Sequence, residues 1–216
     1  MLLGLLNGQL TIPIAIMIII AIIIALTFHE FGHAFTAKLF GDNTAEKAGR
    51  LSLNPLVHID PMGLLMVAMV GFGYAKPVPT NPRNFRNKLA SPTIAFAGPA
   101  MNLILATIGM NLFAYGRLNG IESIAGEGQA IFFEYFVTIN LLLFLFNLLP
   151  IGALDGHYIA EYVLRSPYNY KYYQWNSQYG NLLLMGLIVA SIVGVPIFSV
   201  LWRMAYKITP FINFVT

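Results

Sequence analysis

The sequence has no cysteine and little charge of either sign. Among its 216 residues, only 10% are Asp, Glu, Lys or Arg, whereas 57% are apolar. A typical soluble domain has about 25% charged and about 45–50% apolar residues. The composition therefore excludes a disordered chain and an ordinary water-soluble globule, and the lack of cysteine excludes disulfides and thiolate metal ligands. A metal ion bound to this chain must be held by His, Asp, Glu or backbone oxygens.

The apolar residues form long runs that predict an all-α polytopic membrane protein. A helix of about 20 apolar residues crosses the ~30 Å hydrocarbon layer of a bilayer. We expect about four transmembrane helices within a single domain covering residues 1–216. Their approximate bounds are 12–40, 92–115, 130–149 and 182–201.

A fifth apolar segment, residues 62–75, is too short to cross the membrane as a helix. It contains Gly63, Gly71 and Gly73, which weaken a helix. We expect a short re-entrant or β-hairpin segment here, because backbone at membrane depth must find its hydrogen bonds within the protein. The unpaired edge of such a hairpin could hold an extended peptide by strand addition, or the segment could be a structural plug.

Basic residues are distributed unevenly between the loops, which predicts an orientation. With the N-terminus outside, nine Lys and Arg residues fall on the cytoplasmic side and three outside, as the positive-inside rule requires. We therefore expect a multi-pass protein of the prokaryotic cell membrane, in contact with the lipid bilayer. The formal net charge of +3 is spread along the chain, so we expect no nucleic-acid partner. The cytoplasmic group is Lys38, Lys47, Arg50, Lys76, Arg83, Arg86, Lys88, Arg165 and Lys171.

The most specific pattern is His-Glu-Phe-Gly-His at residues 29–33, an HExxH motif. In a helix, His29 and His33 share one face and can bind the same metal ion, while Glu30 can accept a proton from water. The motif lies near the cytoplasmic end of the first predicted helix, at hydrocarbon depth. Ionisable groups are costly there and usually functional. The alternative is a polar cluster that packs two helices together.

A catalytic zinc ion needs a third protein ligand and one open position. Asp155 follows the third predicted transmembrane helix, so it lies on the same cytoplasmic side as the histidine pair. One carboxylate beside two neutral imidazoles leaves the site with a net positive charge, which favours ionisation of water near neutral pH. The complete set of candidates for the third ligand is His58, Asp60, Glu134, Asp155 and His157.

Five ordered motifs resemble those of the site-2 protease family of intramembrane zinc metalloproteases, peptidase family M50. The resemblance covers about residues 25–160. We expect the short prokaryotic branch, without a PDZ or CBS domain. The motifs are HEFGH (29–33), NPLVHIDPMG (54–63), GYAKPVPTNP (73–82), AGPAMN (97–102) and NLLPIGALDG (147–156).

This resemblance implies a site and an activity. It implies a catalytic core of three helices and one Zn²⁺ per chain, held by His29, His33 and Asp155. Glu30 is implied as the catalytic base, and Asn147 as a residue that positions substrate or steadies the oxyanion. The implied reaction is hydrolysis of peptide bonds within or near the transmembrane segments of other membrane proteins. Neither the oligomeric state nor the substrate's identity follows from the sequence.

Several residues keep a structural alternative. Asn147 could hydrogen-bond at the end of its helix, and His58 and Asp60 could stabilise the loop before the apolar segment. The family commonly continues its LDG motif with Gly and Arg, whereas this chain has His157 after Gly156. His157 could be an interfacial residue, an orienting residue or an alternative ligand.

Two other functions use the same residues. The first is a non-catalytic, metal-binding pseudoprotease, which the intact Glu30 disfavours because binding alone needs no base. The second is a metal-ion transporter, which the lack of an internal repeat disfavours.

Overall fold

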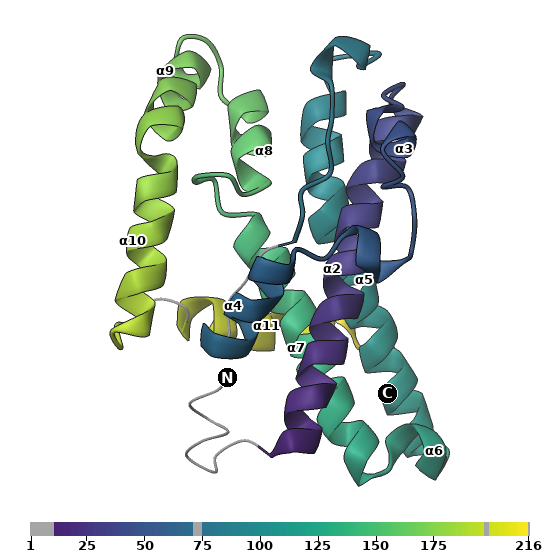
Figure 1. Ribbon diagram of the computed structural model, residues 1–216. Helices are drawn as coiled ribbons and strands as arrows, with labels where there is room; N and C mark the ends of the chain where they lie inside the picture. Colours follow the sequence, from purple (N-terminus) through teal and green to yellow (C-terminus); the bar gives the residue numbers. More distant parts are fainter. Residues whose placement is uncertain (1–10, 71–74, 197–198, 216) are drawn as a thin grey trace.

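The computed structural model describes residues 11–70, 75–196 and 199–215, and this part of the chain is mainly helical (Figure 1). Three long helices pack on one another: α2 (Ile12–Leu39), α5 (Ala90–Leu118) and α7 (Glu127–Asn147). All three are long and apolar enough to cross a membrane. The first three predicted transmembrane helices are therefore confirmed as helices, and the chain is a multi-pass membrane protein.

Small residues line the buried face of α2, whereas isoleucines cover its exposed face. Ile12, Ile16 and Ile20 are 70%, 52% and 44% exposed. Membrane helices associate through small residues because these let the backbones approach closely, while large apolar side chains face lipid. The buried small residues of α2 are Ala15, Ala21, Ala25, Gly32, Ala34 and Ala37.

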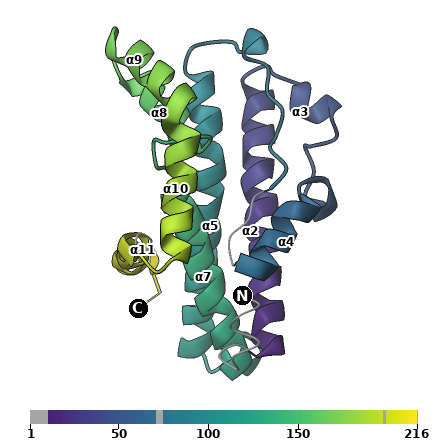
Figure 2. The same cartoon turned by 60° about the vertical axis from the view of Figure 1, so that its left-hand side comes forward.

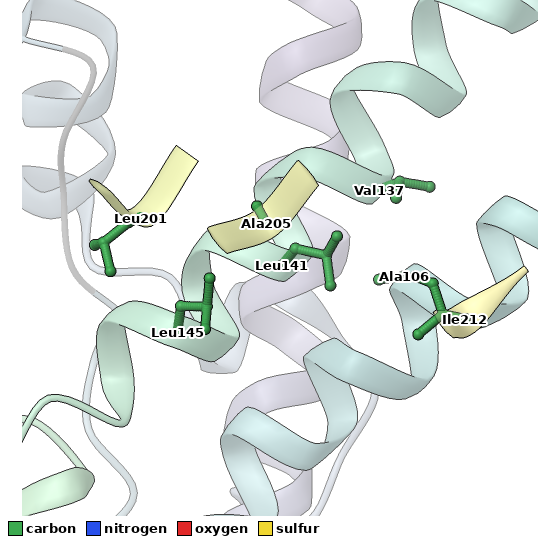
Figure 3. Packing of buried hydrophobic residues seen from close by; sticks show 7 residues of the cluster. All are labelled: Ala106, Val137, Leu141, Leu145, Leu201, Ala205 and Ile212. Atoms are coloured by element: carbon green, nitrogen blue, oxygen red, sulfur yellow. The ribbon is translucent and has the colours of Figure 1, made fainter. Parts of the chain in front are cut away.

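The C-terminal helix α11 (Ser199–Ile212) lies across α7 and α5 (Figures 1 and 2). Figure 3 shows the buried apolar cluster where these helices meet. Asn111 of α5 adds polar contacts, because its amide donates to the Ile212 carbonyl at 2.6 Å and accepts from the Phe214 amide at 2.7 Å. The cluster consists of Ala106, Val137, Leu141, Leu145, Leu201, Ala205 and Ile212.

Short elements connect the long helices at their ends. The buried Asp42, just after α2, accepts hydrogen bonds from the amide of Asn81 and the side chain of Asn84. This carboxylate therefore ties the end of α2 to the segment that leads into α5. The short elements are α3 (Thr44–Lys47), η1 (Pro55–Val57), η2 (Pro82–Asn84) and α6 (Glu122–Ala125).

The predicted hairpin is wrong for the first part of its segment, where the chain forms helix α4 (Pro61–Val70). Asp60 accepts hydrogen bonds from the backbone amides of Met62 and Gly63, and Pro61 occupies a position that favours helix initiation. Residues 71–74 lie outside the described part of the chain. Beyond them, Ala75 forms an isolated antiparallel bridge with Ile59.

The predicted fourth helix, residues 182–201, has the wrong bounds. Helix α10 (Asn181–Ile192) ends at Ile192. Gly194 adopts the left-handed conformation (φ 101°), and Pro196 follows before α11 begins, so the helix does not continue.

This helix also begins earlier than predicted. A continuous helical path runs through α9 (Tyr168–Trp175) and a π-helical turn, η3 (Asn176–Gly180), into α10. Helix α8 (Gly156–Val163) precedes this path and packs on both α5 and α9. The sequence did not indicate the π-helical turn, because one such turn within a helix does not change the pattern of apolar residues recognisably.

Candidate metal centre

One helix and one loop bring His29, His33 and Asp155 together. The two histidines lie one turn apart on α2, and Asp155 ends the loop between α7 and α8. The Nε2 atoms of His29 and His33 are 3.0 Å apart, and Oδ2 of Asp155 lies 3.2 and 3.4 Å from them. A ligand atom from each of the three residues lies within 4.8 Å of the other two, a grouping that could hold a metal ion.

The hydrogen bonds on the far side of each imidazole define where its proton is. Nδ1 of His33 lies 2.7 Å from the Ile94 carbonyl, which can only accept, so this nitrogen carries the proton. Nδ1 of His29 donates in the same way to Oδ1 of Asn102, also at 2.7 Å. In the neutral rings both Nε2 atoms are consequently unprotonated. Three lone-pair atoms then face one another, an arrangement that a cation stabilises.

The spacing of the three atoms fits a tetrahedral metal ion. Zinc–nitrogen and zinc–oxygen bonds are about 2.0–2.2 Å, so two ligand atoms of a tetrahedral site are roughly 3.3–3.6 Å apart. The two contacts with Asp155 are close to this spacing and the histidine pair is slightly closer. Oδ2 of Asp155 is buried and makes no hydrogen bond to the described part of the chain. The donor set therefore suits zinc.

Gly98 of α5 leaves the space that the two imidazoles occupy. A Cβ atom at this position would lie 2.3 Å from Nε2 of His33 and 2.6 Å from Nε2 of His29. Both distances are far inside van der Waals contact. The absence of a side chain at residue 98 is thus a requirement of the site's geometry.

Glu30 lies beside this group and touches a different segment. It is 7% exposed, and its Oε2 accepts a hydrogen bond of 3.1 Å from the backbone amide of Val78. The guanidinium of Arg50 donates to the carbonyls of Lys76 and Pro77 in the same segment. Burial lowers the pKa of Arg50, while the nearby carboxylate of Glu30 opposes that shift. Residues 76–78, in the segment before α5, are thus held against α2 at Glu30.

Asn102 contacts a proposed ligand, whereas the sequence predicted for it only a role in holding membrane helices together. Its Oδ1 orients His29, and its Nδ2 donates to the Ala25 carbonyl and to Oδ1 of Asn140. Both asparagine side chains are fully buried. The available signal was the AGPAMN motif, in which residue 102 stands one helical turn after Gly98 and on the same face of α5.

Asn147 is the last residue of α7, and its amide donates to the Leu143 carbonyl at 3.0 Å. This is the bond expected from the helix-end alternative. A role for Asn147 with substrate stays a prediction.

The remaining candidates occupy other positions. His58 is fully buried and contacts the Ser52 carbonyl through Nε2 at 2.7 Å, so it orders the loop before α4. His157 packs its ring against Tyr158 and Tyr172. Burial lowers the pKa of His157, although the carboxylate of Glu161 opposes the shift.

Comparisons with known proteins show which family the chain resembles. Residues 117–191 match the sequence pattern of "Peptidase family M50". The chain is 40% identical over 198 residues to "Putative zinc metalloprotease YwhC" of Bacillus subtilis, covering 89% of this chain and 88% of the relative. It is 33% identical over 183 residues to "Putative zinc metalloprotease Rip2" of Mycolicibacterium smegmatis, covering 82% of this chain and 68% of that relative. No solved structure matches the chain.

The identity to YwhC extends over most of both chains, and the family pattern includes the loop that carries Asp155. Both findings agree with the resemblance expected from the five motifs. The chain therefore belongs to peptidase family M50, the site-2 protease family.

Proposed function

We propose that His29, His33 and Asp155 hold the single zinc ion of this enzyme and that Glu30 is its catalytic base. As a member of family M50, the chain is an intramembrane zinc metalloprotease. The observation that carries the assignment of residues is the convergence of three ligand atoms from α2 and the loop after α7. Zinc bound there supplies a Lewis acid that polarises a peptide carbonyl and makes water nucleophilic near neutral pH.

The chain's own groups then move the proton. The Glu30 carboxylate takes a proton from the attacking water and delivers it to the amine that leaves. The Val78 amide donates to one of its two oxygens, which leaves the other oxygen as the proton acceptor. Asn102 and the Ile94 carbonyl keep both imidazoles in the tautomer that binds metal. Asn147, at the end of α7, is our candidate for the contact with the substrate's oxyanion.

For the membrane topology, we propose four crossings. The helices α2, α5 and α7 form the catalytic core, and the helical path from Tyr168 to Ile192 makes the fourth crossing. The N-terminus then lies outside and the metal site faces the cytoplasm, as the distribution of basic residues supports. Helix α4 is a re-entrant element beside the core, because a helix of 10 residues is too short to cross a bilayer.

The substrate of a membrane-embedded protease is itself a membrane protein. We propose that this chain cleaves within or near transmembrane segments in the prokaryotic cell membrane, as a single domain covering residues 1–216. The exposed isoleucines on α2 support a position within the bilayer.

The decisive experiment compares Glu30→Gln with His29→Ala in purified full-length protein. Glu30→Gln keeps the three ligands, so it should retain zinc while cleavage of a transmembrane-helix substrate falls by about 10²–10⁴-fold or more. His29→Ala should lose both zinc and cleavage. Zinc is measured by elemental analysis after dialysis, and the products are identified by mass spectrometry.

Two results would contradict the proposal. Cleavage by Glu30→Gln at the wild-type rate would remove Glu30 from the mechanism. Retention of zinc by His29→Ala at the wild-type level would place the metal elsewhere.

A further inference from the structure

The loop that carries Asp155 is held in place by the π-helical turn η3, which comes after α8 and α9 in the sequence. This loop, residues 148–155, leaves α7 and returns toward the histidines. The side-chain amide of Asn176 makes two hydrogen bonds with Gly152. Its Oδ1 accepts from the Gly152 amide at 2.8 Å, and its Nδ2 donates to the Gly152 carbonyl at 3.0 Å. One side chain therefore satisfies both backbone groups of a single loop residue.

The residues around this contact allow the π-helical turn and the loop to pack closely. Asn176 is 6% exposed and is the first residue of the π-helical turn η3. π-Helical turns often occur at functional sites, where they displace side chains from the regular helical register. Gly152 has φ 61°, in the left-handed region that favours glycine. A Cβ atom on Gly180 would lie 2.2 Å from Oδ1 of Asn176 and 2.8 Å from the Gly152 nitrogen.

The contact lies three residues from the proposed ligand. The carboxylate of Asp155 must stay within about 3.5 Å of two imidazole nitrogens to share a metal ion with them. The imidazoles are fixed on a long helix, whereas a loop is intrinsically more mobile. The hydrogen bonds of Asn176 to the amide and the carbonyl of Gly152 restrain the loop, so that Asp155 stays near the imidazoles.

We infer that Asn176 is a positioning residue of the metal site, which acts on Asp155 through the backbone of Gly152. This inference rests on the proposed role of Asp155 as a zinc ligand. Asn176 does not itself contact the three ligand atoms in the described structure. Its removal should therefore weaken zinc binding without abolishing the site.

The test measures zinc affinity of the full-length protein by competition with a chromophoric chelator. Asn176→Ala should bind zinc about 10-fold or more weakly, since partners that orient metal ligands typically contribute 10–100-fold. The matched control is Asn111→Ala, because Asn111 also uses both ends of its amide to hold a distant backbone, at α11. The control should lose a similar amount of thermal stability and bind zinc as the wild type does.

A second variant perturbs the contact between Asn176 and Gly152 but keeps the side-chain amide of Asn176. Gly180→Ala places a methyl group against Oδ1 of Asn176 and should weaken zinc binding in the same direction. If Asn176→Ala does not fold, Gly180→Ala carries the test. Wild-type zinc affinity in the folded variants would overturn the inference.

A third measurement is independent of the metal. Amide hydrogen exchange of residues 150–155 in the chelator-treated, zinc-free protein should be faster in Asn176→Ala than in Asn111→Ala and the wild type. Equal exchange rates would overturn the inference. If the wild type bound no zinc at this site, the proposed function would fail, while the exchange rates would still report whether Asn176 holds the loop.

Discussion

The metal site has two halves that are held in different ways. The helix half, His29 and His33, lies on one continuous helix and is oriented from α5 by Asn102 and a backbone carbonyl. The loop half, Asp155, lies between two helices, and its loop is tied from outside the catalytic core by Asn176. The helix half is therefore fixed by secondary structure, whereas the loop half depends on tertiary contacts.

This difference explains why helical spacing alone identifies the helix half, whereas Asp155 was singled out only by its position after the third predicted helix and by the family resemblance. A spacing of four residues in a helix is enough to align two imidazoles. No comparable spacing rule relates Asp155 to its partners, which are more than 120 residues earlier in the chain. The following predictions perturb the two halves separately, beginning with the largest expected effect.

Gly98→Ala should prevent the two histidines of the helix half from binding metal. The new methyl carbon would lie 2.3 Å from Nε2 of His33, so the imidazole must leave its position and zinc binding and cleavage should both be lost. The control is Gly186→Ala, because a Cβ atom there has nothing within 4 Å. Zinc content and cleavage are measured in both variants. Full zinc occupancy in Gly98→Ala would show that the ligands are not where we place them.

Asn102→Ala should weaken the helix half without destroying it. His29 loses the acceptor that fixes its tautomer, so zinc affinity should fall by about 10–100-fold. Asn102→Asp keeps an oxygen acceptor and should recover part of that loss. Exchange of the loop amides should stay as in the wild type, since this variant leaves the contact of Asn176 intact. An unchanged zinc affinity in the folded Asn102→Ala protein would argue against the tautomer assignment.

Asp42→Asn should alter stability and leave both halves of the site unchanged. Burial alone would raise the pKa of Asp42, but hydrogen bonds from Thr44, Asn81 and Asn84 lower it overall. A lowered pKa in the folded state means that the ionised group stabilises the protein above its ordinary pKa of 3.8, and that this stabilisation is lost as the pH falls.

The difference in free energy of unfolding between the wild type and Asp42→Asn should be about 1–3 kcal/mol at neutral pH and should shrink below pH 3.8. Thermal unfolding as a function of pH measures it, and zinc affinity at neutral pH should be equal in the two proteins. A difference that grows in acid would have the wrong sign for a carboxylate stabilised in its ionised form.

Tyr172→Phe should have the smallest effect on zinc affinity, and it should act through the loop half. The Tyr172 hydroxyl donates to the Pro150 carbonyl at 2.9 Å, but the contact is exposed to solvent. A neutral hydrogen bond contributes about 0.5–1.5 kcal/mol, and exposure places this one at the low end. Zinc affinity should change far less than in Asn176→Ala. An equal change in both variants would show that the loop depends on its whole contact with α9 rather than on Asn176.

Much of the fold follows from hydrophobic runs alone. The ends of the first three transmembrane helices were predicted to within about three residues. The reason is that a run of about 20 apolar residues can satisfy its backbone hydrogen bonds in lipid only as a helix. Residues 62–70 were misjudged because a short apolar run carries no period that separates a helix from a strand. The helix over 182–201 was misplaced because its helical path starts in α9, which is rich in tyrosine, and because its end depends on Gly194.

The site was predictable where chemistry is local. The HExxH motif names two ligands and a base directly, and the structure brings Asp155 to them. The contacts of Asn102 and Asn176 were not predictable, since an asparagine in a membrane helix has many possible partners. Only the packing of α2 on α5, and of the π-helical turn on the loop, selects among them.

The central claim is that two imidazoles and one carboxylate from these two halves share one zinc ion. X-ray absorption at the zinc edge, on purified zinc-loaded protein, tests it most directly. We predict nitrogen and oxygen neighbours at about 2.0–2.2 Å with the outer scattering of two imidazoles, and the loss of this signal in Asp155→Ala. A spectrum with fewer than two imidazoles, or one unchanged in Asp155→Ala, would contradict the account.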